Sequence, residues 1–335
     1  MAVGESQVDG RGGTDAAVGW RHTVRTIMRD TTARWGLYIV GFVLAVTAFV
    51  TIDTYLSTLT FGAYEDYAMA EWLPIFDHPT AIPQPGEEPG TDIPPAFAEW
   101  PWSWETWEGF KRYPLGTDPK GRDYFTRIVY GTRVSVSVGI VATGIGLIGG
   151  TVVGAVAGFY GGWVDDSLMR AVEIIYAIPA LLLIIVFTVF VGNSGITWII
   201  IAVGIVFIPV FSRIIRSRVL SVREMDYIEA ARAAGVKDRH IILRHVVPNS
   251  FAPMLVYATL QIGITILIVA GVSFLGYGAQ PPTPDWGQML NTSHGYMHSN
   301  IWLSIWPGLA IMLTIMGFNL LGDGLQDALD PRIDN

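Results

Sequence analysis

The chain has 335 residues, of which 51% are hydrophobic and 15% are charged, and its net charge is −8. Soluble domains carry about 25% charged residues, so this composition indicates a membrane protein and excludes a disordered chain. The lack of cysteine excludes disulfides, iron–sulfur clusters, cysteine zinc sites and thiol catalysis, and the acidic balance argues against nucleic acid as a partner.

Long apolar stretches recur along the chain. A helix needs roughly 20 mostly apolar residues to cross a bilayer. Six stretches meet this requirement, at about 36–58, 134–159, 174–192, 197–217, 250–275 and 302–322. The first is too long for the apolar part of a signal peptide, so we expect it to remain as an anchor. The sequence therefore predicts an all-α integral membrane protein with six transmembrane helices.

Lys and Arg are distributed unevenly between the connecting segments. Fifteen of the 21 basic residues fall in four of them, at 1–35, 160–173, 213–249 and 323–335. The other six lie between Lys111 and Arg133. Because basic residues collect on the cytoplasmic side of a membrane, we expect these four segments, and with them both termini, in the cytoplasm.

The second apolar stretch carries glycine at every fourth position over three helical turns. These residues are Gly146, Gly150, Gly154 and Gly158. A period of four places bare backbone along one helix face, where another helix can approach closely. We expect tight packing inside the bundle, and the alternative is a pore lining.

Two segments outside the apolar stretches are substantial. Residues 59–113 are rich in proline and hold five tryptophans, which are Trp72, Trp100, Trp102, Trp104 and Trp107. We expect an extracytoplasmic capping insertion there, ahead of a core over 114–322, and a ligand or partner contact is the alternative. The second segment, 218–249, is expected to form the main cytoplasmic loop.

The loop 218–249 contains helix-start and helix-stop signals. Ser221 and Glu224 form a capping-box pair that predicts a helix start, and Gly235 predicts its end. A second short helix is expected over 238–247, ending before Pro248. The small alanine side chains of the first helix would allow the backbone of another protein to approach closely.

The run Glu229-Ala-Ala-Arg-Ala-Ala-Gly235, followed by Pro248, resembles the loop signature of ABC-importer permeases. His245 and Val247 stand where that signature has isoleucine and leucine. Four further runs resemble the C-type permeases of dipeptide and oligopeptide importers. They are Leu115-Gly-Thr-Asp-Pro-Lys-Gly-Arg-Asp123, Gly158-Phe-Tyr-Gly-Gly-Trp-Val-Asp165, Pro281-Pro-Thr-Pro-Asp-Trp-Gly287 and Gly317-Phe-Asn-Leu-Leu-Gly-Asp-Gly-Leu325. The resemblance extends over about 20–60 and 113–333.

The resemblance implies the six-helix permease fold of a type I ABC importer in the cell membrane, with a coupling helix at 223–234. The implied partners are a second homologous permease subunit in a heterodimer, one or two ABC ATPase subunits and an extracytoplasmic substrate-binding protein, assembled in the lipid bilayer. The residues implied to couple this chain to the ATPase are Glu229, Ala230, Ala231, Gly235 and Pro248, with Ser221 and Glu224 as the cap. Peptides are the implied substrate, and nickel, glutathione or an oligosaccharide are alternatives within the same class.

The chain itself carries no signature of an enzyme. It lacks the Gly-x-x-x-x-Gly-Lys-Ser/Thr run that cradles ATP phosphates, so ATP and Mg²⁺ are expected on the partner ATPase. We expect no catalytic, cofactor or metal site on this chain. His294 and His298 share a helical spacing but lack a third ligand.

Two other classes of membrane protein are alternatives to a permease. An intramembrane protease is suggested by Gly192-Asn-Ser-Gly195, but no apolar stretch contains a histidine to act as base. A secondary carrier would place ionisable groups at mid-membrane, and the apolar stretches hold almost none.

Overall fold

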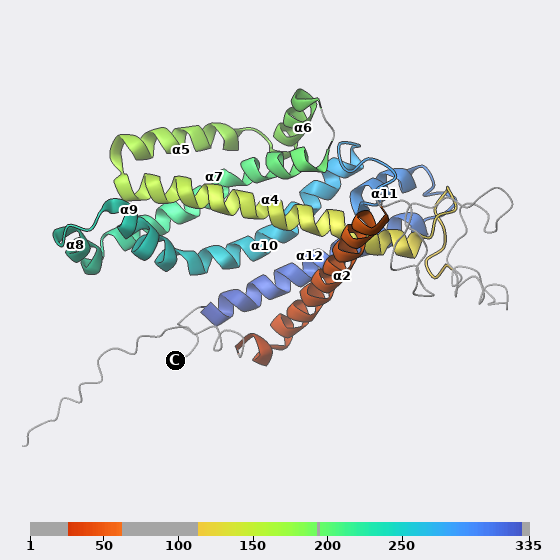
Figure 1. The fold of residues 1–335 in the computed structure, drawn as a ribbon, viewed down its shortest axis with the longest axis horizontal. Helices are drawn as coiled ribbons and strands as arrows, with labels where there is room; N and C mark the ends of the chain where they lie inside the picture. The colour runs from red at the N-terminus through yellow and green to blue at the C-terminus, as the bar shows by residue number, and fades with distance from the viewer. Residues whose placement is uncertain (1–25, 62–112, 193–194, 330–335) are drawn as a thin grey trace, which may run out of the picture.

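The structure is a computed structural model that describes residues 26–61, 113–192 and 195–329 (Figure 1). Within these ranges the regular elements are helices, and the loops between them hold one isolated β-bridge, between Thr117 and Asp123. The predicted all-α class is confirmed. Residues 62–112, which hold the tryptophans of the expected insertion, lie outside the described ranges, as do most of the segment 1–35 and the end of the tail.

Among the described residues, five helices contain a stretch long and apolar enough to cross a membrane. They are α2 (Thr31–Phe61), α4 (Tyr124–Tyr160), α7 (Ile196–Arg223), α10 (Val247–Phe274) and α12 (Trp302–Leu329). Helices α4, α7 and α10 follow the long axis of the molecule, and α2 crosses α12 along one edge (Figure 1). A short helix, α11 (Trp286–His294), closes one end of the bundle, which we call the α11 end.

The third apolar stretch is broken. Instead of one helix over 174–192, the structure has α5 (Gly162–Ala177) and α6 (Ala180–Val191), bent by 90° with respect to each other. Ile178 is extended and Pro179 stands at the N-cap of α6. Proline lacks an N–H and disfavours a helical conformation in the residue before it, which explains the position of the break. If the bent pair is counted as one broken span, the number of candidate spans among the described residues rises from five to six.

The glycine face of α4 packs against α7, as expected. A Cβ placed on Gly150 would lie 2.4 Å from the Cβ of Phe211, and one on Gly154 would lie 2.4 Å from the carbonyl oxygen of Ser212. Neither approach leaves room for a methyl group. The backbones of α4 and α7 are therefore held closer than any other residue type would allow, and these two helices form the centre of the apolar core.

Helix α2 is held by close packing and by one polar contact. Gly36 and Gly324 are two of the points of close approach between α2 and α12, where an added Cβ would collide with the opposite helix. On the other side, the hydroxyl of Tyr130 in α4 donates a hydrogen bond of 2.5 Å to the buried carboxylate of Asp53 in α2. Asp53 therefore joins two helices inside the bundle.

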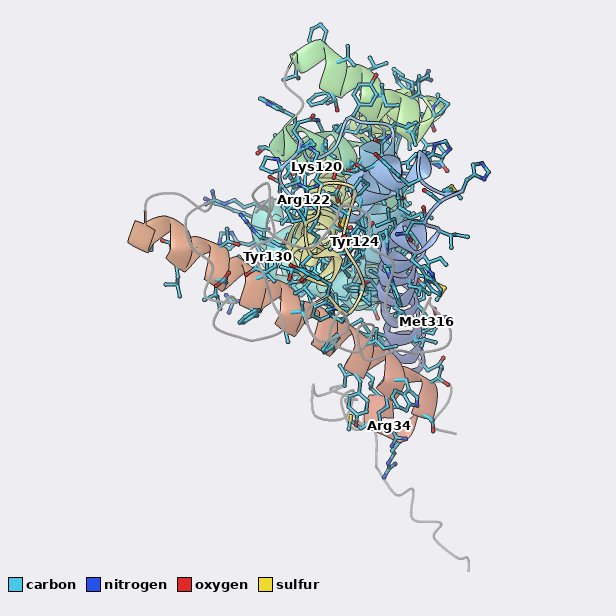
Figure 2. All side chains as sticks on the ribbon, turned by 90° about the vertical axis from the view of Figure 1, so that its right-hand side faces the viewer. Arg34, Lys120, Arg122, Tyr124, Tyr130 and Met316 are labelled. Atoms are coloured by element: carbon cyan, nitrogen blue, oxygen red, sulfur yellow. The ribbon has the colours of Figure 1, made fainter. Side chains whose placement is uncertain are left out.

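The α11 end is organised by buried polar residues. Asp285 is fully buried, caps α11 and accepts a hydrogen bond of 2.9 Å from Ser135 of α4. The indole of Trp286 is buried and donates to the carbonyl of Ile128 at 2.9 Å. Arg122 and Tyr124 lie at this same end, which faces the viewer in Figure 2. Two of the runs that carried the resemblance thus fix the architecture of this end.

Candidate functional site: helix α8 and its connections

At the end of the bundle opposite to α11, the segment between α7 and α10 projects from the long helices (Figure 1). It contains α8 (Asp226–Ala233), α9 (Asp238–Ile241) and a π-helical turn, η3 (Ile242–Val246). With eight residues, three of them charged, α8 is too short and too polar to cross a membrane. It is the projecting element in which the sequence predicted a coupling site.

The predicted capping box at Ser221 and Glu224 is wrong. Ser221 lies in the last turn of α7 and donates its hydroxyl to a carbonyl of the preceding turn, while Glu224 is the C-cap of α7. Helix α7 extends this far because Val219 and Val222 continue to bury apolar side chains in the bundle. Helix α8 begins instead after Met225, whose side chain makes no capping hydrogen bond.

The predicted end of α8 at Gly235 is confirmed. Gly235 has a φ of +78°, a left-handed conformation that glycine adopts without strain. Its N–H donates to the carbonyl of Arg232 at 2.9 Å, and the N–H of Val236 donates to the carbonyl of Ala231 at 3.1 Å. These two bonds form a Schellman motif, which satisfies carbonyls that would otherwise lack partners at a helix end.

The second predicted helix does not end before Pro248. Helix α9 continues through η3 directly into α10, and Pro248 lies in the first turn of α10. The chain stays helical across Pro248, which lacks an N–H to donate, because the turn immediately before it is π-helical. As a consequence, the loop and the long helix α10 are joined without a flexible break.

The exposed surface of α8 and its flanks is largely apolar or small. Glu229 and Ala230 are exposed, as are Ala233 and Ala234. Two larger apolar side chains of the flanking segments are also exposed, Met225 by 45% and Leu243 by 71%. Exposed apolar side chains grouped among polar ones mark interaction surfaces, and the small alanines permit the close approach of a partner.

The opposite side of α8 is anchored in the core. Ile228 is fully buried and belongs to the same apolar cluster as Val222 of α7, Ile241 of α9 and Val246 of η3. Ala231, one turn after Ile228, packs against this cluster. Burial of an isoleucine side chain contributes about 1.5 to 3 kcal/mol, which stabilises the attachment of α8 to the bundle.

Two arginines connect the loop to the end of α4. The guanidinium of Arg232 lies 4.8 Å from the centroid of the Phe159 ring. Arg223, at the end of α7, donates from Nη1 to the carbonyl of Gly158 at 3.1 Å. Cations are favoured at the C-terminal end of a helix because its last carbonyls carry partial negative charge. Both contacts therefore bind the loop to the same turn of α4.

A third connection reaches α10. The side-chain amide of Asn249 donates to the hydroxyl of Tyr227 at 3.2 Å and to the carbonyl of His245 at 2.7 Å. The rings of Tyr227 and His245 meet edge to face, 6.3 Å apart. His245 is therefore part of the packing around α8. Together with the contacts to α4 and α7, this cluster ties α8 to three of the long helices.

The predicted coupling residues fall in different environments. Glu229, Ala230, Gly235 and Pro248 are exposed, whereas Ala231 is half-buried under the helix. The residues that attach α8 to the bundle were not predicted from the sequence; they are Tyr227, Ile228 and Arg232. The available signal for Ile228 was an aliphatic residue in a short segment that also holds the charged residues Asp226, Glu229 and Arg232. No local signal existed for the contact of Arg232 with Phe159, since it depends on tertiary structure.

The weak alternatives find no support in the described part of the chain. No group of three or more potential metal ligands occurs among the described residues. His294 closes α11, where its ring meets that of Phe274 at 6.3 Å. Ser194, the serine of the protease-like run, lies outside the described ranges.

Comparison with known proteins agrees with this arrangement. Residues 150–335 match the family described as "Binding-protein-dependent transport system inner membrane component". The chain is 48% identical to the dipeptide transport system permease protein DppC of Alkalihalophilus pseudofirmus, over 65% of this chain and 72% of that protein. It is 44% identical, with the same coverage, to the glutathione transport system permease protein GsiD of Pectobacterium atrosepticum.

Among solved structures, the inward-facing MetNI methionine ABC transporter is similar in fold. The TM-score is 0.50 at 21% sequence identity, over 61% of this chain and 97% of that chain. The match of more than half the chain to one family, the curated relatives and the shared fold lead to the same assignment. The chain belongs to the family of inner membrane components of binding-protein-dependent transport systems.

Proposed function

We propose that this chain is one of two permease subunits of an ATP-driven importer, and that it forms half of the pathway through which peptides enter the cell. The observation that carries the proposal is the geometry of α8, which exposes one side and is held on the other by α4, α7 and α10. Such a helix can receive a displacement from a partner and pass it to the long helices.

The partners follow from what the chain lacks. It has no phosphate-binding loop of the Gly-x-x-x-x-Gly-Lys-Ser/Thr type, so ATP and Mg²⁺ belong to one or two ATPase subunits. The exposed surface of α8 docks on such a subunit. Binding of ATP draws the two ATPases together, displaces α8 in each permease subunit, and switches the pathway between inward-facing and outward-facing states. An extracytoplasmic binding protein supplies the substrate.

The distribution of Lys and Arg bears on the orientation of the chain in the membrane. The segment that contains α8 is the richest in basic residues, which supports a cytoplasmic position for it and for both termini. The α11 end then faces outward, toward the binding protein. Docking of α8 on a cytoplasmic ATPase requires the same orientation, so the charge distribution and the coupling geometry agree.

Peptides are the proposed substrate because the relative with 48% identity is named as a dipeptide permease. Glutathione is the second candidate, since relatives at 44% and 45% identity are named as glutathione permeases. Glutathione is itself a small peptide with free carboxylates, so both candidates belong to one chemical class.

The test is uptake by the reconstituted complex. This chain is co-expressed with its partner permease, ATPases and binding protein, and the complex is placed in liposomes that contain ATP inside. The proposal expects accumulation of a labelled dipeptide or of glutathione that requires both ATP and the binding protein. Uptake that proceeds without ATP and follows an ion gradient would instead indicate a secondary carrier.

A further inference from the structure

Helix α5 is attached to the bundle along one side only. It lies at the edge of the bundle, where it contacts α4 and α7 (Figure 1). Of its 16 residues, Asp165 and Val172 are the two that are buried. The carboxylate of Asp165 accepts two hydrogen bonds of 2.5 Å from the guanidinium of Arg216 in α7. These contacts fix the inner side of α5 and leave its outer side uncovered in this subunit.

Three charged residues form a row on the uncovered side of α5. Asp166, Arg170 and Glu173 are exposed, and their spacing of four and then three residues places them on one helix face. We call this row the α5 stripe. Within the described residues none of the three has an ion-pair partner within 4.0 Å. The α5 stripe thus presents an acidic, a basic and an acidic group in order, with one acidic group in excess.

Large apolar side chains accompany the α5 stripe. Trp163, one turn before Asp166, is 81% exposed, and Ile174, next to Glu173, is 69% exposed. Lipid is an unfavourable surrounding for the three charges, and water is an unfavourable surrounding for the large apolar side chains. A surface that combines exposed apolar and aromatic side chains with an arginine is typical of a protein–protein interface. We therefore expect another protein to cover this side of α5.

The order of charges disfavours a second copy of this chain as that protein. Two copies insert in the membrane with the same orientation, so a symmetric pair has its two-fold axis along the membrane normal. Such an axis keeps each residue at the same depth in both copies. Asp166, Arg170 and Glu173 would each meet the identical residue of the other copy. Like charges that face each other are destabilising, and the excess acidic group on each copy adds to the repulsion.

We propose that the α5 stripe is the contact surface for a second, non-identical permease subunit, which presents a basic, an acidic and a basic group at the corresponding depths. This inference rests on the proposed function. With that order, opposite charges meet at every level and the excess acidic group of the α5 stripe is neutralised. Charges arranged in this way select a partner chiefly by penalising the wrong pairing. The surface therefore favours a pair of different chains over a pair of identical chains.

The first test uses a variant of this chain in place of the second permease. The mirror variant combines Asp166→Arg, Arg170→Glu and Glu173→Arg, so its charges complement those of the unaltered α5 stripe. Two full-length chains with different affinity tags are co-expressed and extracted in mild detergent. We expect an unaltered chain to recover about tenfold more of the mirror variant than of a second unaltered copy. The control Asp327→Arg, at an exposed position of α12, changes the net charge by the same amount and should give no increase.

Three results of this test would overturn the proposal. The first is equal recovery of the mirror variant and of Asp327→Arg, which would indicate an effect of net charge alone. The second is equal recovery of the mirror variant and of the unaltered copy. The third is a mirror variant that pairs with itself as strongly as with the unaltered chain, because identical charges would face each other in that pair too. The melting temperature of each variant in detergent shows whether it is folded, and a second test leaves all three charges in place.

The second test is cross-linking in the native complex. Ala177 is exposed and lies one turn after Glu173 on the same face, and Ala177→Cys provides a single thiol because the chain contains no cysteine. After treatment of native membranes with a thiol-directed photo-cross-linker, we expect an adduct with a different multi-span permease, identified by mass. Phe42→Cys replaces a side chain 70% exposed on α2, at the other edge of the bundle, and should give no such adduct (Figure 1).

Failure of this surface and failure of the proposed function give different results. An adduct of Ala177→Cys with a second copy of this chain, with another kind of protein or with no protein would overturn the assignment of the α5 stripe. Equal permease adducts from Ala177→Cys and Phe42→Cys would overturn it as well. In each of these cases the proposed function stands, provided that a second permease co-purifies with the unaltered chain. If no second permease co-purifies, the proposed function itself fails and the inference fails with it.

Discussion

The guanidinium of Arg232 lies 4.8 Å from the centroid of the Phe159 ring, so a charged side chain of α8 rests on the last turn of α4. Helix α4 in turn packs against α7 through its glycine face, which leaves little freedom for the two helices to slide. Under the proposed function, a displacement of α8 would therefore be passed to α4 and α7 as one unit. Packed helices change between discrete arrangements, as a transporter with two states requires.

Removal of this contact should weaken coupling without preventing assembly. A cation–π contact contributes about 0.5 to 1 kcal/mol at exposed sites. We expect Arg232→Ala to lower peptide uptake per ATP hydrolysed in proteoliposomes, and Phe159→Leu to have the same effect without adding to it in the double variant. Arg239→Ala, an exposed arginine of α9, is the control. Equal effects of Arg232→Ala and Arg239→Ala would indicate a general charge effect.

Gly235 should be replaceable only by residues that accept a left-handed conformation. A Cβ at Gly235 has no atom within 4 Å, so the cost of substitution arises from its φ of +78° alone. Gly235→Val is expected to strain the end of α8 by about 1 to 3 kcal/mol and to uncouple ATP hydrolysis from uptake. Gly235→Asn should retain most uptake, because asparagine tolerates this conformation. Normal uptake by Gly235→Val would refute the assignment.

The glycine face of α4 gives a prediction about stability. Gly154→Ala places a methyl group 2.4 Å from the carbonyl oxygen of Ser212, which the backbone of α7 must move to relieve. Forced overpacking of this kind costs about 1 to 3 kcal/mol. Gly144→Ala, on the same helix but with no atom within 4 Å of the new methyl, should change the melting temperature in detergent very little. Equal melting temperatures for both variants would contradict the packing described for α4 and α7.

The buried hydrogen bonds at the α11 end give a prediction about local stability. Ser135 donates to Asp285 at 2.9 Å and accepts from the N–H of Trp286 at 3.2 Å. Ser135→Ala removes both bonds and leaves a buried carboxylate with one donor fewer, at a cost of about 1 to 3 kcal/mol. The measurement is limited proteolysis of the segment 276–301. The exposed Ser299→Ala should be cut no faster than the unaltered protein, whereas Ser135→Ala should be cut faster.

Much of the fold could be predicted because a membrane imposes simple requirements on length and polarity. Five of the six apolar stretches correspond to long helices, and the four-residue period of glycine in α4 predicted close packing. The prediction of a single helix over the third stretch, 174–192, was wrong. Its apolar run passes through Pro179 without a change of composition, so hydropathy alone could not show that the chain bends there by 90°.

The candidate site was predictable where the signal is local. Gly235 ends α8 because only a residue free of Cβ strain fits there easily, and the sequence shows such a residue directly. The prediction of a helix start at Ser221 and Glu224 was wrong. Val222 is buried, so α7 continues past the residues that would otherwise favour the start of a new helix. The predicted helix end before Pro248 was also wrong. A proline in the first turn of a helix and a proline just after the last turn of one give the same signal in the sequence.

The most direct test of the central claim is cross-linking from α8. Since the chain contains no cysteine, Ala230→Cys and Ala234→Cys each provide a single reactive position on the exposed surface of this helix. After treatment of native membranes with a thiol-directed photo-cross-linker, we expect an adduct with an ATPase that carries a phosphate-binding loop, identified by mass. His298→Cys at the α11 end should give no such adduct. An ATPase adduct from His298→Cys, or none from either α8 position in membranes that retain the ATPase, would contradict the coupling role of α8.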